Sequence, residues 1–365
     1  MRELIISGTI LCGANFTPLE GYICVDRKNG IIKEIGEGKA PSKIKGIIIP
    51  SFINAHTHLG DSIAKDIPFN DLDELVKPPF GIKHQILKCT PTRKLCAAMR
   101  SSLKDMLYTG TSHFIDFREG GIKGVKALQR AMQDSILEGL ILGRPESEEE
   151  AEHLLNHCHG FGISGANDFE LEYLEKLRYL AKRRGKYFAI HAGEKDRSDI
   201  DTALSLEPDI LVHMTHALPR DLKKVADKGI PIVLCPRSNF ATRVAGFSKP
   251  NVRKMIDLGI CLGLGTDNVL INSPCMFTEM EFLSKIFLDG EIEVLRMATL
   301  NGAIILGMEN QVGTIETGKA ACLIVINKNS NNIRYTKNLP RTIVRRARPD
   351  DIIAVVNKGK ILRSD

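Results

Sequence analysis

The stretch PSFINAHTHLGDS, residues 50–62, places two histidines one residue apart at the end of an apolar run. Alternate residues of a β-strand point to the same side, so His56 and His58 would share one face of a strand. A buried strand excludes two imidazoles unless something binds them, and two converging imidazoles suit a divalent transition metal such as zinc. The stretch therefore predicts a metal site at the end of a buried strand.

Seven further runs resemble this one, and longer helical patterns separate them, which is the βαβ rhythm of a parallel sheet. The eight runs are GIIIPSFINAH, SHFIDFRE, LEGLILGRP, HGFGISG, KYFAIHAGE, DILVHMTH, IPIVLCPRSN and ICLGLGTDN. Eight strand–helix units in about 260 residues is the size of a (β/α)₈ TIM barrel. We therefore predict an α/β protein with a barrel over residues 50–311.

The two ends of the chain have a different pattern. Residues 1–49 and 312–365 consist of short alternating apolar runs broken by Gly and Asn, which indicates strands and hairpins. We expect both ends to meet as one small β-sandwich domain beside the barrel.

Polar residues follow almost every predicted barrel strand. Catalytic groups of such barrels lie at the carboxyl ends of the strands, where the loops form the site. One such residue has an ordinary structural explanation, but seven strands that end alike do not. These residues are His56 and His58, 116–119, Arg144, 191–194, His213 and His216, 237–239, and 266–268.

The composition is that of a soluble globular protein. The 365 residues are 43% hydrophobic and 26% charged, and the net charge of +6 comes from scattered lysines and arginines, which argues against nucleic-acid binding. We find no signal peptide, no apolar run of about 18 residues and no Cys-x-x-Cys pair among the nine cysteines. We therefore expect a cytoplasmic enzyme with buried thiols, no membrane contact, a small-molecule substrate and a homo-oligomeric state.

Taken together, the motifs resemble the amidohydrolase superfamily, in the deaminase and chlorohydrolase-like branch that includes cytosine, guanine and adenosyl-type deaminases. The matching stretches are HTH at 56–58, HAGE at 191–194, VHMTH at 212–216, CPRSN at 235–239 and GTDN at 265–268. GTIETGKAACLIVI, at 313–326, resembles the return of such chains into the small β domain, although Ala320 and Cys322 stand where acids are common.

This resemblance implies a set of site residues. The metal ligands fall on His56, His58, His191 and Asp267. Glu194 is implied as a proton shuttle, Asp267 as the acceptor of the proton of the metal-bound water, and His213 as the oxyanion-stabilising residue. His213 keeps the family's spacing to Pro236, whereas His216 is three residues too late.

The resemblance also implies one divalent metal per chain, with zinc favoured and iron as the alternative. The branch with two metals bridges them by a lysine on the fourth strand, and HCHGFGISGAND has none. The bound metal lowers the pKa of water towards roughly 7, and the resulting hydroxide attacks an sp² carbon that bears nitrogen. Release of ammonia would complete the deamination of a small nitrogen heterocycle or nucleoside-like amine.

Two other functions remain open at this point. One is hydrolysis of a cyclic C–N bond, as in an imidazolonepropionase-like enzyme, which opens a ring rather than releasing ammonia. The other is a catalytically silent binding protein on the same fold.

Several further polar residues are candidates for substrate binding, although a structural role fits each of them at least as well. The concentration of arginine and histidine favours a carboxylate or phosphate on the substrate. His153, His157 and His159 resemble a second metal cluster, but histidines are also common at a helix C-terminus. The substrate-binding candidates are Asp61, His84, Arg118, Arg144, Arg237, Asn239 and His216.

Overall fold

The computed structural model describes residues 3–364. Met1, Arg2 and Asp365, which the predicted β domain includes, lie outside the described residues. The chain divides into two compact units, and each is described here by itself. One contains residues 54–104 and 114–274, and the other contains the residues up to 53, residues 105–113 and the residues from 275 on. The predicted boundaries, 1–49 with 312–365 against 50–311, stay a prediction.

Within residues 3–364, a parallel sheet of nine strands carries the candidate site. Its order is β12-β11-β10-β9-β8-β7-β6-β5-β13, so the neighbours from β5 to β12 follow one another along the chain, and β13 lies beside β5. The strands are β5 (Phe52–His58), β6 (Thr111–Arg118), β7 (Glu138–Gly143), β8 (Gly160–Ile163), β9 (Tyr187–Ala192), β10 (Ile210–His213), β11 (Ile232–Leu234), β12 (Leu262–Leu264) and β13 (Asp267–Asn268).

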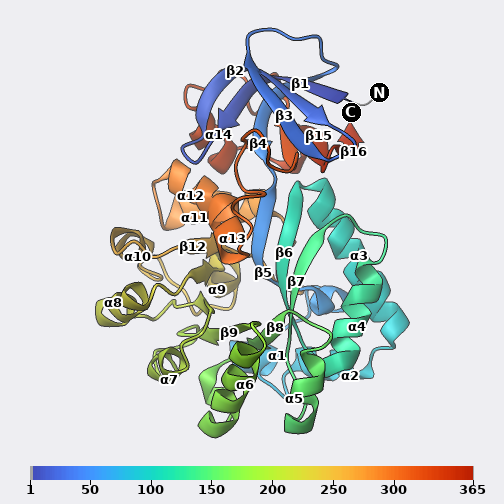
Figure 1. Ribbon diagram of the computed structural model, residues 1–365. Helices are drawn as coiled ribbons and strands as arrows, with labels where there is room; N and C mark the ends of the chain where they lie inside the picture. Colours follow the sequence, from blue (N-terminus) through green and yellow to red (C-terminus); the bar gives the residue numbers. More distant parts are fainter. Residues whose placement is uncertain (1–2, 365) are drawn as a thin grey trace. The chain divides into compact units, whose positions relative to one another are not determined.

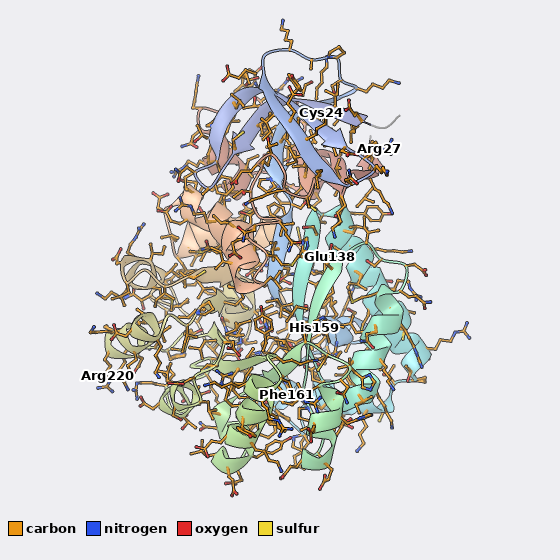
Figure 2. The ribbon with its side chains drawn as sticks, in the orientation of Figure 1. Cys24, Arg27, Glu138, His159, Phe161 and Arg220 are labelled. Atoms are coloured by element: carbon orange, nitrogen blue, oxygen red, sulfur yellow. The ribbon has the colours of Figure 1, made fainter. Side chains whose placement is uncertain are left out.

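Each of the eight predicted runs contains a strand of this sheet, and the reason is burial on both faces. All residues of β5, β6, β8 and β10 are buried, which produces continuous apolar runs rather than alternation. Phe161 on β8, labelled in Figure 2, is fully buried. The first run is an exception in one respect, because its residues 46–50 belong to β4 (Ile44–Pro50) in a different sheet.

Helices follow most strands of the parallel sheet. In Figure 1, α4 packs on β7 and α6 packs on β8 and β9. The helices between its strands are α1 (Leu72–Val76), α2 (Ile82–Cys89), α3 (Thr92–Tyr108), α4 (Gly121–Met132), α5 (Glu148–Leu154), α6 (Leu171–Arg183), α7 (Ile200–Ser205), α8 (Pro219–Lys228), α9 (Pro236–Ala241) and α10 (Val252–Asp257). Short 3₁₀ turns cover Leu59–Ile63 and Ala166–Asp168.

The second unit contains a mixed sheet of seven strands within the described residues, built from both ends of the chain. The order is β16-β15-β14-β4-β1-β2-β3, with β1 (Glu3–Cys12), β2 (Thr17–Asp26), β3 (Ile31–Glu37), β14 (Leu323–Ile326), β15 (Ile352–Asn357) and β16 (Lys360–Ser364). Ile10, Ile23 and Val325 belong to its buried core. Its helices are α11 (Met276–Ile286), α12 (Glu291–Ala298), α13 (Leu300–Ile305) and α14 (Leu339–Arg345), with a 3₁₀ turn at Pro349–Asp351.

The two ends of this seven-stranded sheet approach each other. Arg27, which follows β2 and is labelled in Figure 2, donates from Nε to the Gly359 carbonyl at 3.3 Å. The Ile32 amide on β3 donates to the Lys319 carbonyl at 2.8 Å, close to the start of β14. The sheet therefore curls around its own apolar core.

Among the residues that the structure describes, we find no helix with the length and apolarity needed to cross a membrane.

Candidate metal centre and active site

Four buried side chains converge at the carboxyl ends of the parallel strands. His56 and His58 come from β5, His191 from β9 and Asp267 from the start of β13. Their ligand atoms all lie within 4.8 Å of one another. This is the set that the sequence motifs predicted as metal ligands, and the structure brings all four together.

The donor atoms face a common point. His56 Nε2 lies 3.2 Å from Asp267 Oδ1 and 3.2 Å from His191 Nε2, and His58 Nε2 lies 3.5 Å from Asp267 Oδ1. Asp267 Oδ2 is buried and has no hydrogen-bond partner. Three imidazole nitrogens and a carboxylate that point at one another in a buried site are an arrangement that a bound cation would stabilise.

The other ring nitrogens of two of these histidines are held by acceptors. His191 donates from Nδ1 to the Ile163 carbonyl at 2.7 Å, and His58 Nδ1 lies 3.1 Å from the Phe117 carbonyl and 2.8 Å from Glu119 Oε1. These contacts place the ring proton on Nδ1 and leave the Nε2 lone pair for a metal, as is usual for metal-bound histidine.

The pKa values favour the metal-binding forms. Burial lowers the pKa of His56, brings the pKa of His58 to about 3, and holds the pKa of His191 well below its ordinary value. Burial opposes ionisation of Asp267, but its hydrogen bond with His56 and the neighbouring imidazoles keep its pKa well below the usual range. Neutral imidazoles and an ionised carboxylate are the forms that bind zinc.

A polar clamp fixes the chain just before Asp267. Asn54 on β5 donates to Thr266 Oγ1 at 2.8 Å and accepts from the Thr266 amide at 3.0 Å. A side chain at Gly265 would place its Cβ 2.6 Å from the Cβ of His56, so only glycine permits this close approach. Sequence reasoning missed Asn54, although a polar residue inside the apolar run SFINAH was a usable signal.

Glu194 and His213 lie beside the cluster. Glu194 Oε2 is 3.4 Å from His213 Nε2, and Asn239 Nδ2 is 3.4 Å from Glu194 Oε1 and 3.1 Å from His213 Nδ1. His213 Nδ1 also lies 3.3 Å from Asn239 Oδ1, and donation from the nearer Asn239 Nδ2 would leave the His213 proton on Nε2, on the side of Glu194. Burial raises the pKa of Glu194 to about 7, a value suited to proton transfer near neutral pH.

The backbone is strained at the same place. His213, Met214 and Asp267 have φ values of 75°, 52° and 60°, in the left-handed region that non-glycine residues rarely adopt. Such strain concentrates at functional sites, where the surrounding structure maintains it. Gly193 has φ of 60° and turns the chain between His191 and Glu194.

A network of buried charges adjoins the cluster. The ammonium of Lys83 lies 2.7 Å from Glu119 Oε1 and 3.3 Å from Asp61 Oδ2. Arg118 pairs with Glu119 and, at 3.3 Å, with Asp116. All five side chains are at most 5% exposed. Arg118 is therefore already paired within the protein.

Three of the four remaining substrate-binding candidates have structural partners. His84 Nε2 is 2.9 Å from the Val76 carbonyl, and Arg237 donates to the Ser273 carbonyl at 2.7 Å. His216 Nε2 is 2.9 Å from the Val244 carbonyl, so His213 and not His216 reaches the site. Arg144 is 8% exposed. The assignment of these residues to substrate binding stays a prediction.

A cavity of about 210 Å³ opens next to His191 and Glu194. Its wall carries more acidic than basic side chains, which does not favour the anionic substrate that the arginines and histidines indicated. Lys195, on this wall, pairs with Asp73 at 2.6 Å. The ionisable residues of the wall are Asp73, Lys77, Asp168, His191, Glu194, Lys195, Asp196 and Asp199.

Two further predictions concern histidines and cysteines away from this site. The rings of His153 and His157 lie 5.2 Å apart. Among the described residues, two groups of side chains are placed to hold a metal, the cluster above and a group of His213, Cys235 and Asp267, and neither includes them. The expectation of nine buried thiols was wrong in part, because Cys89 is exposed and Cys12, Cys96 and Cys261 are half-buried. Cys89 ends the short helix α2, where one face meets solvent.

The fold and the cluster together define a metal-binding α/β protein. A model of the amidohydrolase family matches residues 47–362. The chain therefore belongs to the amidohydrolase family, and it is a hydrolase that acts on carbon–nitrogen bonds.

Similar proteins agree with this family. An uncharacterized protein of Methanocaldococcus jannaschii is 36% identical and aligns over 96% of this chain and 97% of its own length. A 5-methylthioadenosine/S-adenosylhomocysteine deaminase of Caldanaerobacter subterraneus is 27% identical over 99% of this chain and 93% of its own.

Two solved structures have a similar fold. An adenosine deaminase from Xanthomonas campestris with bound zinc superimposes with a TM-score of 0.84 at 17% identity, covering 99% of this chain and 93% of its own. An atrazine chlorohydrolase from Arthrobacter aurescens complexed with zinc gives a TM-score of 0.79 at 17% identity, covering 99% and 95%. At these identities the likeness concerns the fold.

Proposed function

We propose that this protein is a mononuclear, zinc-dependent aminohydrolase that deaminates a small nitrogen heterocycle or a nucleoside-like amine. The observation that carries the proposal is the arrangement of Glu194 and His213 beside a buried cluster of three histidines and Asp267. The acid, the hydrogen-bond donor and the metal ligands that hydrolytic deamination needs are thus adjacent.

His56, His58, His191 and Asp267 would hold the metal, which supplies a water acidic enough to act as nucleophile near neutral pH. Asp267 Oδ2, buried and unpartnered, accepts the proton of the attacking water. Glu194, with its raised pKa, delivers a proton to the substrate nitrogen that becomes basic as the tetrahedral centre forms. His213 donates from Nε2 to the developing oxyanion, and Asn239 holds the tautomer that makes this possible.

The same proposal includes a closed barrel. β12 pairs with β11 and β13 pairs with β5, and only residues 265 and 266 separate β12 from β13. We take β12 and β13 as two halves of one eighth strand, which joins the sheet back to its first strand. The curled seven-stranded sheet would then be the small β-sandwich.

The substrate would be neutral or positively charged. Asp168, Asp196 and Asp199 line the cavity near Glu194, while Lys195 is paired with Asp73. A phosphate would meet this negative wall at an energetic cost. The relative named as a 5-methylthioadenosine/S-adenosylhomocysteine deaminase supports adenine nucleosides as the first compounds to test.

The test is ammonia release from a panel of amino-purines, amino-pyrimidines, pterins and adenine nucleosides, with zinc-loaded protein and chelator-treated protein side by side. We expect ammonia from at least one nucleoside-like amine, lost on chelation and restored by zinc, and slower release from the matching 5′-phosphate. Ring opening without ammonia would replace the proposal by an imidazolonepropionase-like reaction. Binding without turnover across the panel would indicate a silent binding protein.

A further inference from the structure

We propose that Lys83 is a positioning residue, whose buried ammonium group orients two of the four metal ligands, His58 and Asp267. The inference rests on the proposed function, because it takes these two residues as ligands. Lys83 comes from α2, outside the strands that carry the ligands, and within that helix it is the buried residue, at 3% exposed.

The ammonium of Lys83 lies close to three buried oxygens. The ammonium lies 2.7 Å from Glu119 Oε1, 3.1 Å from Asn268 Oδ1 and 3.3 Å from Asp61 Oδ2. The contact with Asn268 is a hydrogen bond and the two contacts with Glu119 and Asp61 are ion pairs, so the ammonium is held by one amide and two carboxylates. The geometry fixes the ammonium at one point.

The first connection of the Lys83 ammonium to a metal ligand runs through Glu119 to His58. The Oε1 atom of Glu119 that meets Lys83 is also 2.8 Å from His58 Nδ1. A carboxylate that accepts from Nδ1 fixes the ring orientation and the tautomer of a metal-bound histidine. Lys83 pairs with this same oxygen of Glu119, and Arg118 pairs with the other oxygen.

The second connection of the Lys83 ammonium to a metal ligand runs through Asn268 to Asp267. Asn268 accepts from Lys83 through Oδ1 and donates from Nδ2 to Asp267 Oδ1 at 3.0 Å. The ammonium therefore decides which way the amide of Asn268 is turned, since its oxygen must face the lysine. With that orientation the amide N–H groups point to the carboxylate ligand.

If Lys83 acted on the metal through its charge alone, its removal would have the opposite effect on metal binding from the one that we expect. A cation near the cluster repels a divalent metal, so removal of the Lys83 charge would tighten zinc binding if electrostatics dominated. Loss of orientation would weaken zinc binding, typically by 10- to 100-fold for a residue that holds a metal ligand in place. Whether zinc binding tightens or weakens without Lys83 therefore distinguishes an electrostatic role from a positioning role.

The experiment is a zinc affinity measurement by competition with a chromogenic chelator on wild-type protein and on Lys83→Met. We expect about 10- to 100-fold weaker zinc binding and a changed absorption spectrum of the cobalt-substituted protein. Zinc affinity equal to or tighter than wild type would overturn the inference. Asp221→Asn serves as the matched control, because it breaks a buried pair with Arg197, 2.7 Å away, and touches none of these residues.

A second variant covers the case in which Lys83→Met does not fold. Asn268→Asp keeps the acceptor for Lys83 but replaces the donor to Asp267 by a carboxylate oxygen. Added negative charge would tighten zinc binding, whereas loss of the donor would weaken it about 10-fold or more, so weaker binding supports the inference and unchanged or tighter binding overturns it. If wild-type protein itself binds no zinc, the proposed function fails, and the inference fails with it.

Discussion

Two groups of buried ionisable side chains lie side by side in this protein. They differ in whether the protein itself supplies the partners of these side chains. In the network of Lys83, Glu119, Arg118 and Asp116, each carboxylate meets a cation of the protein. In the cluster of three histidines and Asp267, the electron-pair donors face one another, and Asp267 Oδ2 has no hydrogen-bond partner among the described residues. The carboxylates of the first group are balanced by lysine and arginine of the protein, whereas the second group would be balanced by a bound metal cation. Buried electron-pair donors that face one another without a cation of the protein thus indicate where a ligand would bind.

The largest expected effect is on metal content. The double variant His56→Ala with His58→Ala removes two of four donors from one strand, so zinc should fall from about one ion per chain to none by elemental analysis. The control is His153→Ala with His157→Ala, a pair of histidines away from the cluster, which should keep its zinc. Equal zinc in both double variants would show that the metal site has been assigned to the wrong histidines.

Next in size is the effect of Glu194→Gln on turnover. Glutamine keeps the shape and the contact with Asn239 but carries no proton, so the rate should fall by about 10²–10⁴-fold while zinc is retained. The substrate found in the ammonia panel provides the assay, and Glu172→Gln on the exposed side of α6 is the control. A metal-replete Glu194→Gln protein with the wild-type rate would rule out the proton shuttle.

A smaller effect, on the free energy of unfolding, is expected when the buried ion-pair network around Arg118 is disrupted. Asp116 accepts from the Leu59 amide at 2.6 Å and pairs with Arg118, and it is fully buried. Asp116→Asn should lower the free energy of unfolding by on the order of 3 kcal/mol while zinc content is kept. Denaturant titration of metal-free protein measures this.

The control for Asp116→Asn is Asp227→Asn, at an exposed pair with Lys223, which should change the free energy of unfolding by no more than about 0.5 kcal/mol. A metal-free Asp116→Asn protein as stable as wild type would mean that the network contributes little to folding.

The smallest effect concerns pH. Burial and the charge of Lys83 lower the pKa of His84 to about 4, against about 6.5 in an unfolded chain. Between these values the unfolded chain binds a proton that the folded protein does not, so stability falls as the pH falls through this window and is complete above it. His84→Gln should therefore lose less stability than wild type between pH 7 and pH 5, as unfolding titrations at the two pH values would measure. Equal losses would contradict this pKa.

Much of the parallel sheet was predictable because strands buried on both faces leave continuous apolar runs. His56, His58, His191 and Asp267 were predictable for a related reason, since each interrupts or follows such a run. The structure brings all four together, although it was the family resemblance that completed the set.

The supporting residues could not be predicted in the same way. Lys83 lies on a short helix in the stretch KPPFGIKHQIL, where nothing in the spacing indicates that its side chain is buried. Its partners, Glu119 and Asn268, are 36 and 185 residues away along the chain. Only the folded chain shows which buried polar groups meet, because hydrogen-bond partners distant in sequence leave no periodic pattern.

The clamp between Asn54 and Thr266 has a consequence for the order of events during synthesis. The two residues are 212 positions apart, and Asp267 follows the second of them directly. A nascent chain that ends before residue 266 holds three of the four ligands but has neither the clamp nor the carboxylate. If these four side chains bind the metal as proposed, high-affinity binding would wait until residue 267 has left the ribosome. The proposed ion would then be acquired only by chains that have completed the parallel sheet.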